Sequence, residues 1–154
     1  MTAAFFRGRR RRAAAATGAV TFALVALSAC DKPTPLTTVT VGTSEVHSQA
    51  ACYDGKAGID EKDFGDCLQG DGKTIKATVD DNIHFGVDPK IAKKGWTIVV
   101  GSQRGLGKST KTYRTVPAGT ILQASRTGEV KVSIVMFGDG KTYGVWNYTL
   151  KDNS

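Results

Sequence analysis

Two histidines, His47 and His84, are the side chains most suited to metal or acid–base chemistry in this sequence. A blue-copper site needs a cysteine and a histidine clustered late in the chain together with an earlier histidine. Neither a cysteine nor a histidine lies near Met136, so we expect no metal centre and no cofactor. An adventitious ligand role for either histidine stays open. No Gly-x-Ser-x-Gly stretch is present and nothing places a histidine in a Ser-His-Asp triad, so we expect no enzyme.

Two further stretches resemble ligand-binding motifs without matching them. The sequence GSQRGLGKST begins at Gly101, but five residues separate Gly101 from Gly107 where a phosphate-binding loop has four. We therefore interpret it as a long polar loop or hairpin tip. A group of acids between the second and third cysteines and just beyond lacks the spacing of a calcium loop and is interpreted as a solvated loop. These acids are Asp54, Asp60, Glu61, Asp63, Asp66 and Asp71.

The motif with the most specific chemistry lies near the N-terminus. Leu27, Ser28, Ala29 and Cys30 follow one another, so that a leucine and two small residues precede a cysteine. This order is typical of the bacterial lipobox, where small side chains fit the signal-peptidase site and the thiol accepts a diacylglyceryl group through a thioether. Cleavage falls just before that cysteine. We therefore predict that Cys30 is lipidated and becomes the first residue of the mature chain.

The residues before this motif fit an export signal. Five arginines lie at positions 7 and 9–12, and no acid appears before Asp31. Residues 13–29 are small or apolar, a run near the lower limit for crossing a bilayer. We expect residues 1–29 to form a helical signal peptide. The arginines also raise twin-arginine export, but Ala13 and Ala14 stand where that signal has a bulky apolar residue, so we expect the general secretory route.

The other two cysteines, Cys52 and Cys67, form an even pair once Cys30 is assigned to the lipid. An exported chain meets an oxidising compartment, where such a pair forms a disulfide. Closing a loop of this length stabilises a fold by roughly 3 kcal/mol in the chain-entropy model. The alternative is a metal or redox pair, but redox cysteines are usually two residues apart.

The charge of the chain changes once the signal is set aside. The sequence has 21 Lys+Arg against 14 Asp+Glu, a formal charge of +7. Five of the 21 are the signal arginines, which leaves 16 basic and 14 acidic residues from Cys30 onward. We therefore expect no nucleic-acid partner.

The remaining cations are unevenly placed along the chain. Residues 89–128 contain basic side chains and no acid, whereas residues 30–72 contain 3 basic and 8 acidic side chains. If folding brings the basic side chains together, they could contact anionic lipid headgroups or wall polymers. The alternative is an ordinary solubilising surface. The cations are Lys90, Lys93, Lys94, Arg104, Lys108, Lys111, Arg114 and Arg126.

The pattern after Cys30 begins with a short tether over residues 30–35, which contains two prolines. Period-2 alternation then predicts strands over residues 36–41, 44–51, 74–79, 82–87, 96–100, 120–125, 129–137 and 142–150. Asp139-Gly140 predicts a hairpin turn between the last two. Short helices are expected over residues 60–68, with Asp60 as N-cap, and after Asp88-Pro89 as far as Gly95.

Seven or eight short strands in one domain, residues 36–154, predict an all-β fold: an immunoglobulin-like β-sandwich with a small helical or loop insertion closed by the disulfide. Val130, Val132, Ile134 and Met136 are expected to share its core face. The disulfide does not join two predicted central strands, so it differs from the pin of antibody domains. A small barrel is the alternative architecture.

Three stretches, CDKPTPLTTVTVG, DDNIHFGVDPKIAKKGWTIVV and KVSIVMF, resemble an actinobacterial (streptomycete-type) lipoprotein family that carries a domain of unknown function. The resemblance runs over most of the chain. It implies export, lipidation and a small β-rich extracytoplasmic domain, and it carries no catalytic residue.

These observations together predict a non-enzymatic lipoprotein on the extracytoplasmic face of the cell membrane. Its N-terminal lipid would hold it there, and its domain would bind or support an envelope protein, an anionic lipid or a wall polymer. The alternative function is a small-ligand or metal-binding accessory protein of an envelope transport system, using His47 or His84.

The lipobox makes a direct prediction. The variant Cys30→Ala has no thiol to accept the diacylglyceryl group, so cells should accumulate an unprocessed, unlipidated precursor. Metabolic labelling with palmitate measures this. Normal labelling of the variant would refute the anchor.

Overall fold

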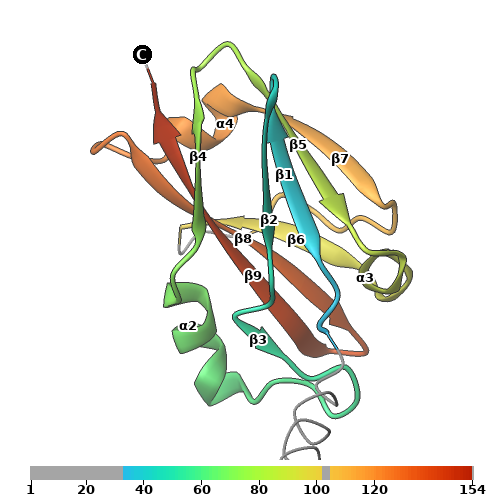
Figure 1. Ribbon diagram of the computed structural model, residues 1–154. Helices are drawn as coiled ribbons and strands as arrows, with labels where there is room; N and C mark the ends of the chain where they lie inside the picture. Colours follow the sequence, from blue (N-terminus) through green and yellow to red (C-terminus); the bar gives the residue numbers. More distant parts are fainter. Residues whose placement is uncertain (1–32, 102–104, 154) are drawn as a thin grey trace, which may run out of the picture. The chain divides into compact units, whose positions relative to one another are not determined.

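The computed structural model describes residues 33–101 and 105–153. Contacts divide the chain into two units, Met1–Pro33 and Thr34–Ser154, and the second carries the fold in Figure 1. Its described residues form nine strands and three short helices. The prediction of a mostly β fold is confirmed.

Sheet A is the smaller of the two sheets. Its strands are β1 (Thr37–Val41), β2 (Ser44–Ser48), β5 (Asn82–Val87) and β7 (Tyr113–Pro117). They lie in the order β2-β1-β5-β7, and every neighbouring pair is antiparallel. Val39 of β1 lies opposite Phe85 of β5, and both side chains point into the core.

Sheet B is built around its longest strand. It contains β3 (Cys52–Tyr53), β4 (Lys73–Ala77), β6 (Trp96–Val100), β8 (Glu129–Gly138) and β9 (Lys141–Asp152). β8 occupies one edge of β9, and β3 and β4 share the other. The β4–β9 pair is parallel, unlike the other pairs in the described residues. Strand β9 is therefore hydrogen-bonded along both edges.

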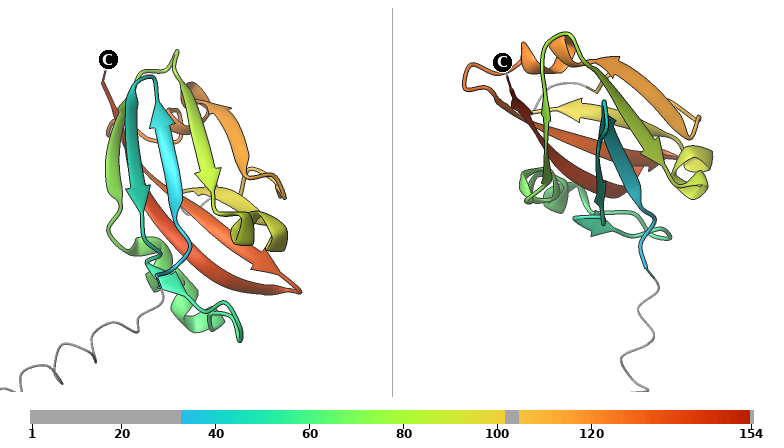
Figure 2. Two further views of the ribbon diagram at one scale, coloured as in Figure 1. Left: turned by 45° about the vertical axis from the view of Figure 1, so that its right-hand side comes forward. Right: turned by 45° about the horizontal axis from the view of Figure 1, so that its top comes forward.

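The main core lies between the two sheets, which face each other in Figure 2. The largest fully buried side chains are Trp96, Trp146, Tyr148 and Phe85. Burying one such apolar side chain contributes about 1.5–3 kcal/mol, so these residues dominate the stability of the packing.

The core face predicted for the closing hairpin is confirmed. The inward residues of β8 are Val130, Val132, Ile134 and Met136.

The turn between β8 and β9 follows the sequence prediction. Asp139 and Gly140 have φ values of 51° and 75°, so both central residues are left-handed. Two-residue hairpins of this kind favour Asp-Gly because that pair adopts positive φ at low cost and matches the twist of the strands. The turn fixes the register in which Ile134 faces Trp146.

Polar side chains also join the two sheets inside the core. The hydroxyl groups of Thr37 on β1 and Tyr148 on β9 lie 2.6 Å apart, and both residues are buried. The indole N–H of Trp146 donates to the carbonyl oxygen of Pro35 at 2.8 Å. These two bonds attach the N-terminal end of the domain to the middle of sheet B.

The helices match the sequence predictions in two cases of three. Helix α2 (Glu61–Gln69) follows Asp60 as N-cap, although the Asp60 side chain makes no capping hydrogen bond. Helix α3 (Pro89–Lys94) begins after Asp88, whose carboxylate accepts from the Lys90 N–H, and ends at Gly95.

The strand predicted over residues 120–125 is wrong, because helix α4 (Ala118–Leu122) covers its first half. Ala118, Ile121 and Leu122 are all buried. Their spacing of three and four residues is helical rather than alternating.

Two strands were not predicted, and two predicted neighbours do not pair. β7 and the two-residue β3 have little alternating apolar sequence of their own. Strands β4 and β5 follow each other in the chain across Asp80 and Asp81, yet β4 joins sheet B and β5 joins sheet A. The Asp81 carboxylate accepts hydrogen bonds from the N–H and the hydroxyl of Thr78. The bond from the backbone N–H is the main reason that the pKa of Asp81 is lowered.

Because Tyr148 is buried, the free energy of unfolding should decrease when the pH rises above 10. Burial raises the pKa of Tyr148 to about 12 from its usual 10.0. A raised pKa contributes stability that is complete below pH 10 and is lost as the pH rises through 12. Tyr148→Phe leaves the Thr37 hydroxyl without this partner and should lower the free energy of unfolding by about 1–2 kcal/mol at neutral pH.

Urea unfolding of both proteins at several pH values tests this. The advantage of the wild type should shrink above pH 10, whereas an advantage that stays constant to pH 12 would contradict the assignment.

Candidate functional site

The outward side of sheet A is open to solvent along all four strands (Figure 2). Strand alternation sends one set of side chains to the core and the other set outward. The outward residues are all exposed or half-buried. We call them the sheet A face: Thr38, Thr40, Glu45, His47, Asn82, His84, Gly86, Tyr113, Thr115 and Pro117.

One half of this face is a hydrogen-bonded group on β1 and β2. The hydroxyl of Thr38 lies 3.0 Å from Nδ1 of His47. Nε2 of the same imidazole lies 2.8 Å from Oε1 of Glu45, whose Oε2 accepts from the Thr40 hydroxyl at 3.3 Å. These contacts orient the four side chains, because each is linked to a cross-strand neighbour.

The other half centres on His84 of β5. The Thr115 hydroxyl lies 3.0 Å from its Nδ1, and the Tyr113 hydroxyl contacts the same nitrogen. The Tyr113 and His84 rings are stacked, with centroids 5.5 Å apart and planes 18° apart. Tyr113 is still 54% exposed. Gly86, which lies opposite Tyr113 in the register, has no side chain.

The chemistry of the sheet A face is that of an uncharged polar surface. It carries hydroxyl, imidazole, amide and phenol groups and no lysine or arginine, and its one carboxylate is paired with His47. Such a surface can hydrogen-bond a neutral hydroxyl-rich chain, and an exposed aromatic ring adds apolar contact.

The same face does not gather metal ligands. His47 and His84 lie on β2 and β5, which β1 separates. Residues 33–101 and 105–153 contain no group of three His, Cys, Asp or Glu side chains that could hold an ion.

The sequence singled out the two histidines of this face but not its other residues. The alternation in β1 predicted a strand and so placed Thr38 and Thr40 on one side of it. Tyr113 and Thr115 were missed because β7 was not predicted. The strand order, which brings β7 beside β5, has no local signal in the sequence.

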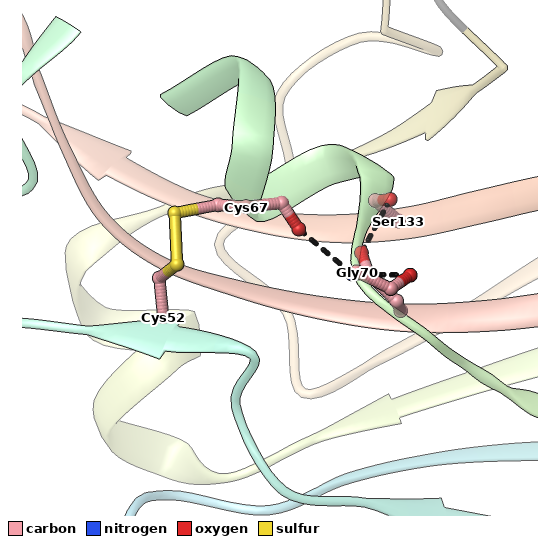
Figure 3. The surroundings of a disulfide bond; sticks show 5 residues. Cys52, Cys67, Gly70 and Ser133 are labelled. Atoms are coloured by element: carbon pink, nitrogen blue, oxygen red, sulfur yellow. Dashed lines mark hydrogen bonds between the residues drawn. A yellow bond between two sulfur atoms is a disulfide. The ribbon is translucent and has the colours of Figure 1, made fainter. Parts of the chain in front are cut away.

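The middle of the outward side of sheet B is covered, in contrast to that of sheet A, whereas Glu129, Lys131 and Lys76 on the same side stay exposed. Cys67 on α2 packs with Val135 and Val145, and Ile59, Phe64 and Leu68 surround them. The Cys52–Cys67 disulfide is present, so that prediction is confirmed. It joins β3 to α2 and does not link the two sheets (Figure 3).

A buried polar network continues this attachment. The side-chain amide of Asn147 donates to the carbonyl oxygens of Cys67 at 2.8 Å and Gly70 at 3.1 Å. Its own Oδ1 accepts from the Ser133 hydroxyl at 2.8 Å. Because the last carbonyl groups of a helix lack partners within it, Asn147 satisfies the end of α2 from sheet B.

A cavity of about 610 Å³ lies between the acidic loop and the β8–β9 turn, lined by Asp60, Glu61, Phe64 and Lys141 among others. The Lys141 amine donates to the Ala57 carbonyl oxygen at 3.2 Å. Asp54 accepts from the backbone N–H groups of its own loop, and the Lys56 N–H is the main reason that the pKa of Asp54 is lowered. The charged groups of this region therefore stabilise the loop itself.

Two of the predicted cations contact the β8–β9 hairpin. The Lys94 amine lies 2.9 Å from Oδ2 of Asp139 and 4.1 Å from the centre of the Tyr143 ring. The hydrogen bond between them raises the pKa of Lys94 and lowers the pKa of Asp139. The Lys108 amine lies 5.2 Å from the centre of the Phe137 ring.

Four of the other described cations lie in three places. The Arg114 guanidinium donates to the carbonyl oxygens of Leu106 and Gly107 and so holds the loop after β6. Lys90 and Lys93 are exposed on α3, and Lys111 is exposed on the loop before β7.

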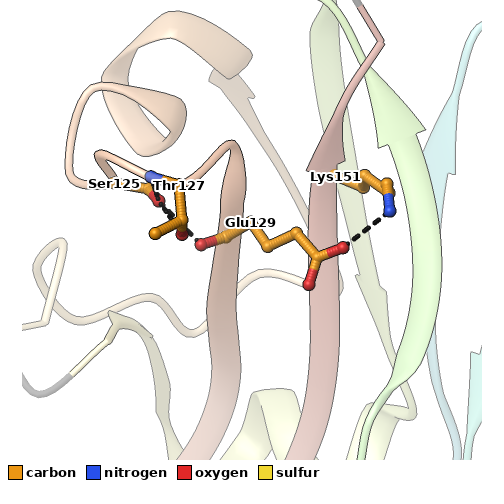
Figure 4. A network of polar contacts seen from close by, with 4 residues as sticks. All are labelled: Ser125, Thr127, Glu129 and Lys151. Atoms are coloured by element: carbon orange, nitrogen blue, oxygen red, sulfur yellow. Dashed lines mark hydrogen bonds and ion pairs between the residues drawn. The ribbon is translucent and has the colours of Figure 1, made fainter.

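Arg126 lies far from these side chains, on the loop before β8. Lys94 reaches the opposite end of that strand, and ten residues of strand span about 33 Å. Glu129 beside Arg126 is paired with Lys151 at 2.7 Å, and Ser125 donates to the Glu129 carbonyl oxygen at 2.8 Å (Figure 4). Arg126 therefore does not share a surface with the other described cations of the basic segment.

Several predicted site residues lie outside the described part of the chain. These are Leu27, Ser28, Ala29, Cys30 and Arg104, together with the signal helix.

No protein-family model, curated protein or solved structure matches this chain. The resemblance to the streptomycete-type lipoproteins therefore stays a prediction. Within residues 33–101 and 105–153, no helix is long and apolar enough to cross a membrane. The function of the sheet A face has to follow from its own residues.

The attachment of α2 to sheet B leads to a prediction. Replacing both Cys52 and Cys67 by alanine should lower the free energy of unfolding by about 3 kcal/mol, because the open chain gains conformational freedom. Hydrogen exchange should quicken in α2 and β3 and stay unchanged in β1 and β5. Equal acceleration in sheet A would contradict the local role of the disulfide.

Proposed function

We propose that this protein is a lipid-anchored, non-enzymatic binding protein of the cell envelope, and that its sheet A face holds a neutral wall polysaccharide. The observation that carries the proposal is the contrast between the two sheets. The middle of sheet B is covered by α2 and the disulfide, whereas sheet A presents oriented polar groups and an exposed Tyr113.

The anchor and the compartment are supported by the sequence. The Leu27-to-Cys30 lipobox and the arginine-rich signal before it predict export and lipidation of Cys30. Two or three acyl chains would hold the protein on the extracytoplasmic face of the membrane, because each buried methylene contributes about 0.8 kcal/mol. The disulfide fits an oxidising compartment.

For the fold, the proposal is an immunoglobulin-like sandwich. Two mostly antiparallel sheets share one core, which supports this class. The parallel β4–β9 pair and the disulfide between β3 and α2 depart from the antibody pattern.

A polysaccharide fits the sheet A face better than an ionic ligand does. Sugar hydroxyl groups can donate to and accept from Thr38, His84 and Thr115, and the C–H face of a sugar ring can lie on Tyr113. An anionic polymer would find no lysine or arginine on this face, and the Glu45 carboxylate would repel it.

The alternative, a metal-binding accessory protein of a transport system, has weaker support. The pair formed by His47 and Glu45 supplies two ligands, and the partners of His84 are hydroxyl groups. Zinc sites in proteins use at least three protein ligands.

Co-sedimentation of the full-length protein with insoluble wall polysaccharide tests the proposal. Tyr113→Ala removes the exposed ring and should weaken binding about tenfold, since truncating a central aromatic contact typically costs more than about 1 kcal/mol. The matched control is Val79→Ala, which truncates another exposed apolar residue on the turn between β4 and β5.

The proposal expects the control to bind as the wild type does. Equal binding by wild type and Tyr113→Ala, or no sedimentation of either protein, would contradict it. Both variants should keep the unfolding midpoint of the wild type, because both side chains are about half exposed.

A further inference from the structure

The end of the domain that receives the tether carries exposed lysines and exposed apolar side chains together. We propose that this end rests on an anionic lipid surface, and that it thereby fixes how the domain stands on the membrane. The inference rests on the proposed lipidation of Cys30, and it goes further by naming the part of the domain that meets the lipid.

The N-terminal segment enters the fold at a fixed place. The Pro35 carbonyl oxygen accepts from Trp146, and the Leu36 carbonyl oxygen accepts from the Asp88 N–H at 3.1 Å. Residues 31–34 lie between the lipidated position and Pro35, and a trans chain spans at most about 3.6 Å per residue. The start of the domain must therefore stay within roughly 18 Å of the lipid, so the tether end can come within the distance of about 8 Å over which charges interact in physiological salt.

The tether end comprises several elements that meet where β1 begins. Thr37 pairs with Ser48 at the end of β2 and with Val87 at the end of β5. Helix α3 follows Val87 directly, and Lys94 at its end is paired with Asp139 of the β8–β9 turn. Figure 1 shows α3, this turn, β3 and α2 in the half of the fold where β1 begins, with the C-terminus at the opposite end.

Four exposed lysines lie on these elements: Lys56, Lys90, Lys93 and Lys141. None of them takes part in an ion pair among the described residues.

Four acids of the tether end have local partners. Asp139 is paired with Lys94, Asp88 caps α3, Asp54 accepts from its own loop, and Asp60 lies 3.7 Å from Lys62. Glu61, Asp63 and Asp66 are exposed on α2, which lies on the side of this end away from α3 (Figure 1). The lysines of α3 therefore have the most direct access to anionic headgroups.

Exposed apolar groups add a second observation. Leu36 is 46% exposed and directly follows the held Pro35. Tyr53 is 36% exposed on β3, beside Trp146 at a ring separation of 6.1 Å. A tyrosine with one apolar side and one polar tip suits the headgroup layer of a membrane.

This placement keeps the proposed polysaccharide site accessible. The strands of sheet A run from the tether end toward the opposite end of the domain (Figure 1). The strands of sheet A would then run away from the membrane, and the sheet A face would be exposed to the wall rather than to the lipid.

Lysine labelling of the full lipidated protein tests the inference. The protein is reconstituted in vesicles of phosphatidylcholine, with or without phosphatidylglycerol, and its amines are acetylated and read by mass spectrometry. Lys90 and Lys93 should each react about fivefold more slowly on the anionic vesicles than on the neutral ones, and high salt should remove the difference. Lys76, exposed on β4 near the C-terminal end of β9, should react equally on both.

Charge reversal provides the matched pair of variants. Lys90→Glu with Lys93→Glu should abolish the protection of Lys56 on anionic vesicles, whereas Lys73→Glu with Lys76→Glu should leave it intact. All four side chains are exposed, so neither change disturbs the core.

The outcomes separate the two proposals. A Cys30 peptide without acyl mass would contradict the anchor, and the orientation falls with it. An acylated Cys30 with equal labelling of Lys90, Lys93 and Lys76 on both kinds of vesicle would overturn the orientation alone.

Discussion

The burial of β9 on both faces and its pairing on both edges is the constraint on which the other features depend. Trp146 and Tyr148 on one face need sheet A to cover them, and Val145 and Asn147 on the other face need α2. The short β3 and the parallel β4 complete its free edge. Because α2 and the disulfide cover sheet B, the outward side of sheet A stays open.

The sequence predicted those parts of the fold whose signals are local. Alternation and Asp139-Gly140 were enough for the β8–β9 hairpin, and Asp88-Pro89 was enough for α3. Helix α4 was not predicted, because one helical spacing of three and four residues within five residues does not distinguish a helix from a short strand. The parallel β4–β9 pair, the missed β7 and the split of β4 and β5 between two sheets are decided by distant contacts that no short window contains.

The candidate site was predictable only in pieces for the same reason. His47 and His84 attract attention as residue types, but their partners come from β1, β2 and β7. The basic segment shows the opposite case, since a run that looks continuous in sequence is divided in space. Lys94 and Lys108 contact the β8–β9 hairpin, Arg114 holds a loop, and Arg126 lies at the far end of β8.

The central claim is that the sheet A face, and not the covered sheet B, binds the envelope partner. An NMR titration of the full-length protein in detergent micelles with soluble fragments of wall polysaccharide tests it most directly. The account predicts that signals of Thr38, His84, Tyr113 and Thr115 shift together with one affinity while those of α2 stay in place. Shifts confined to α2 and the neighbouring cavity, or no shifts at any residue, would contradict it.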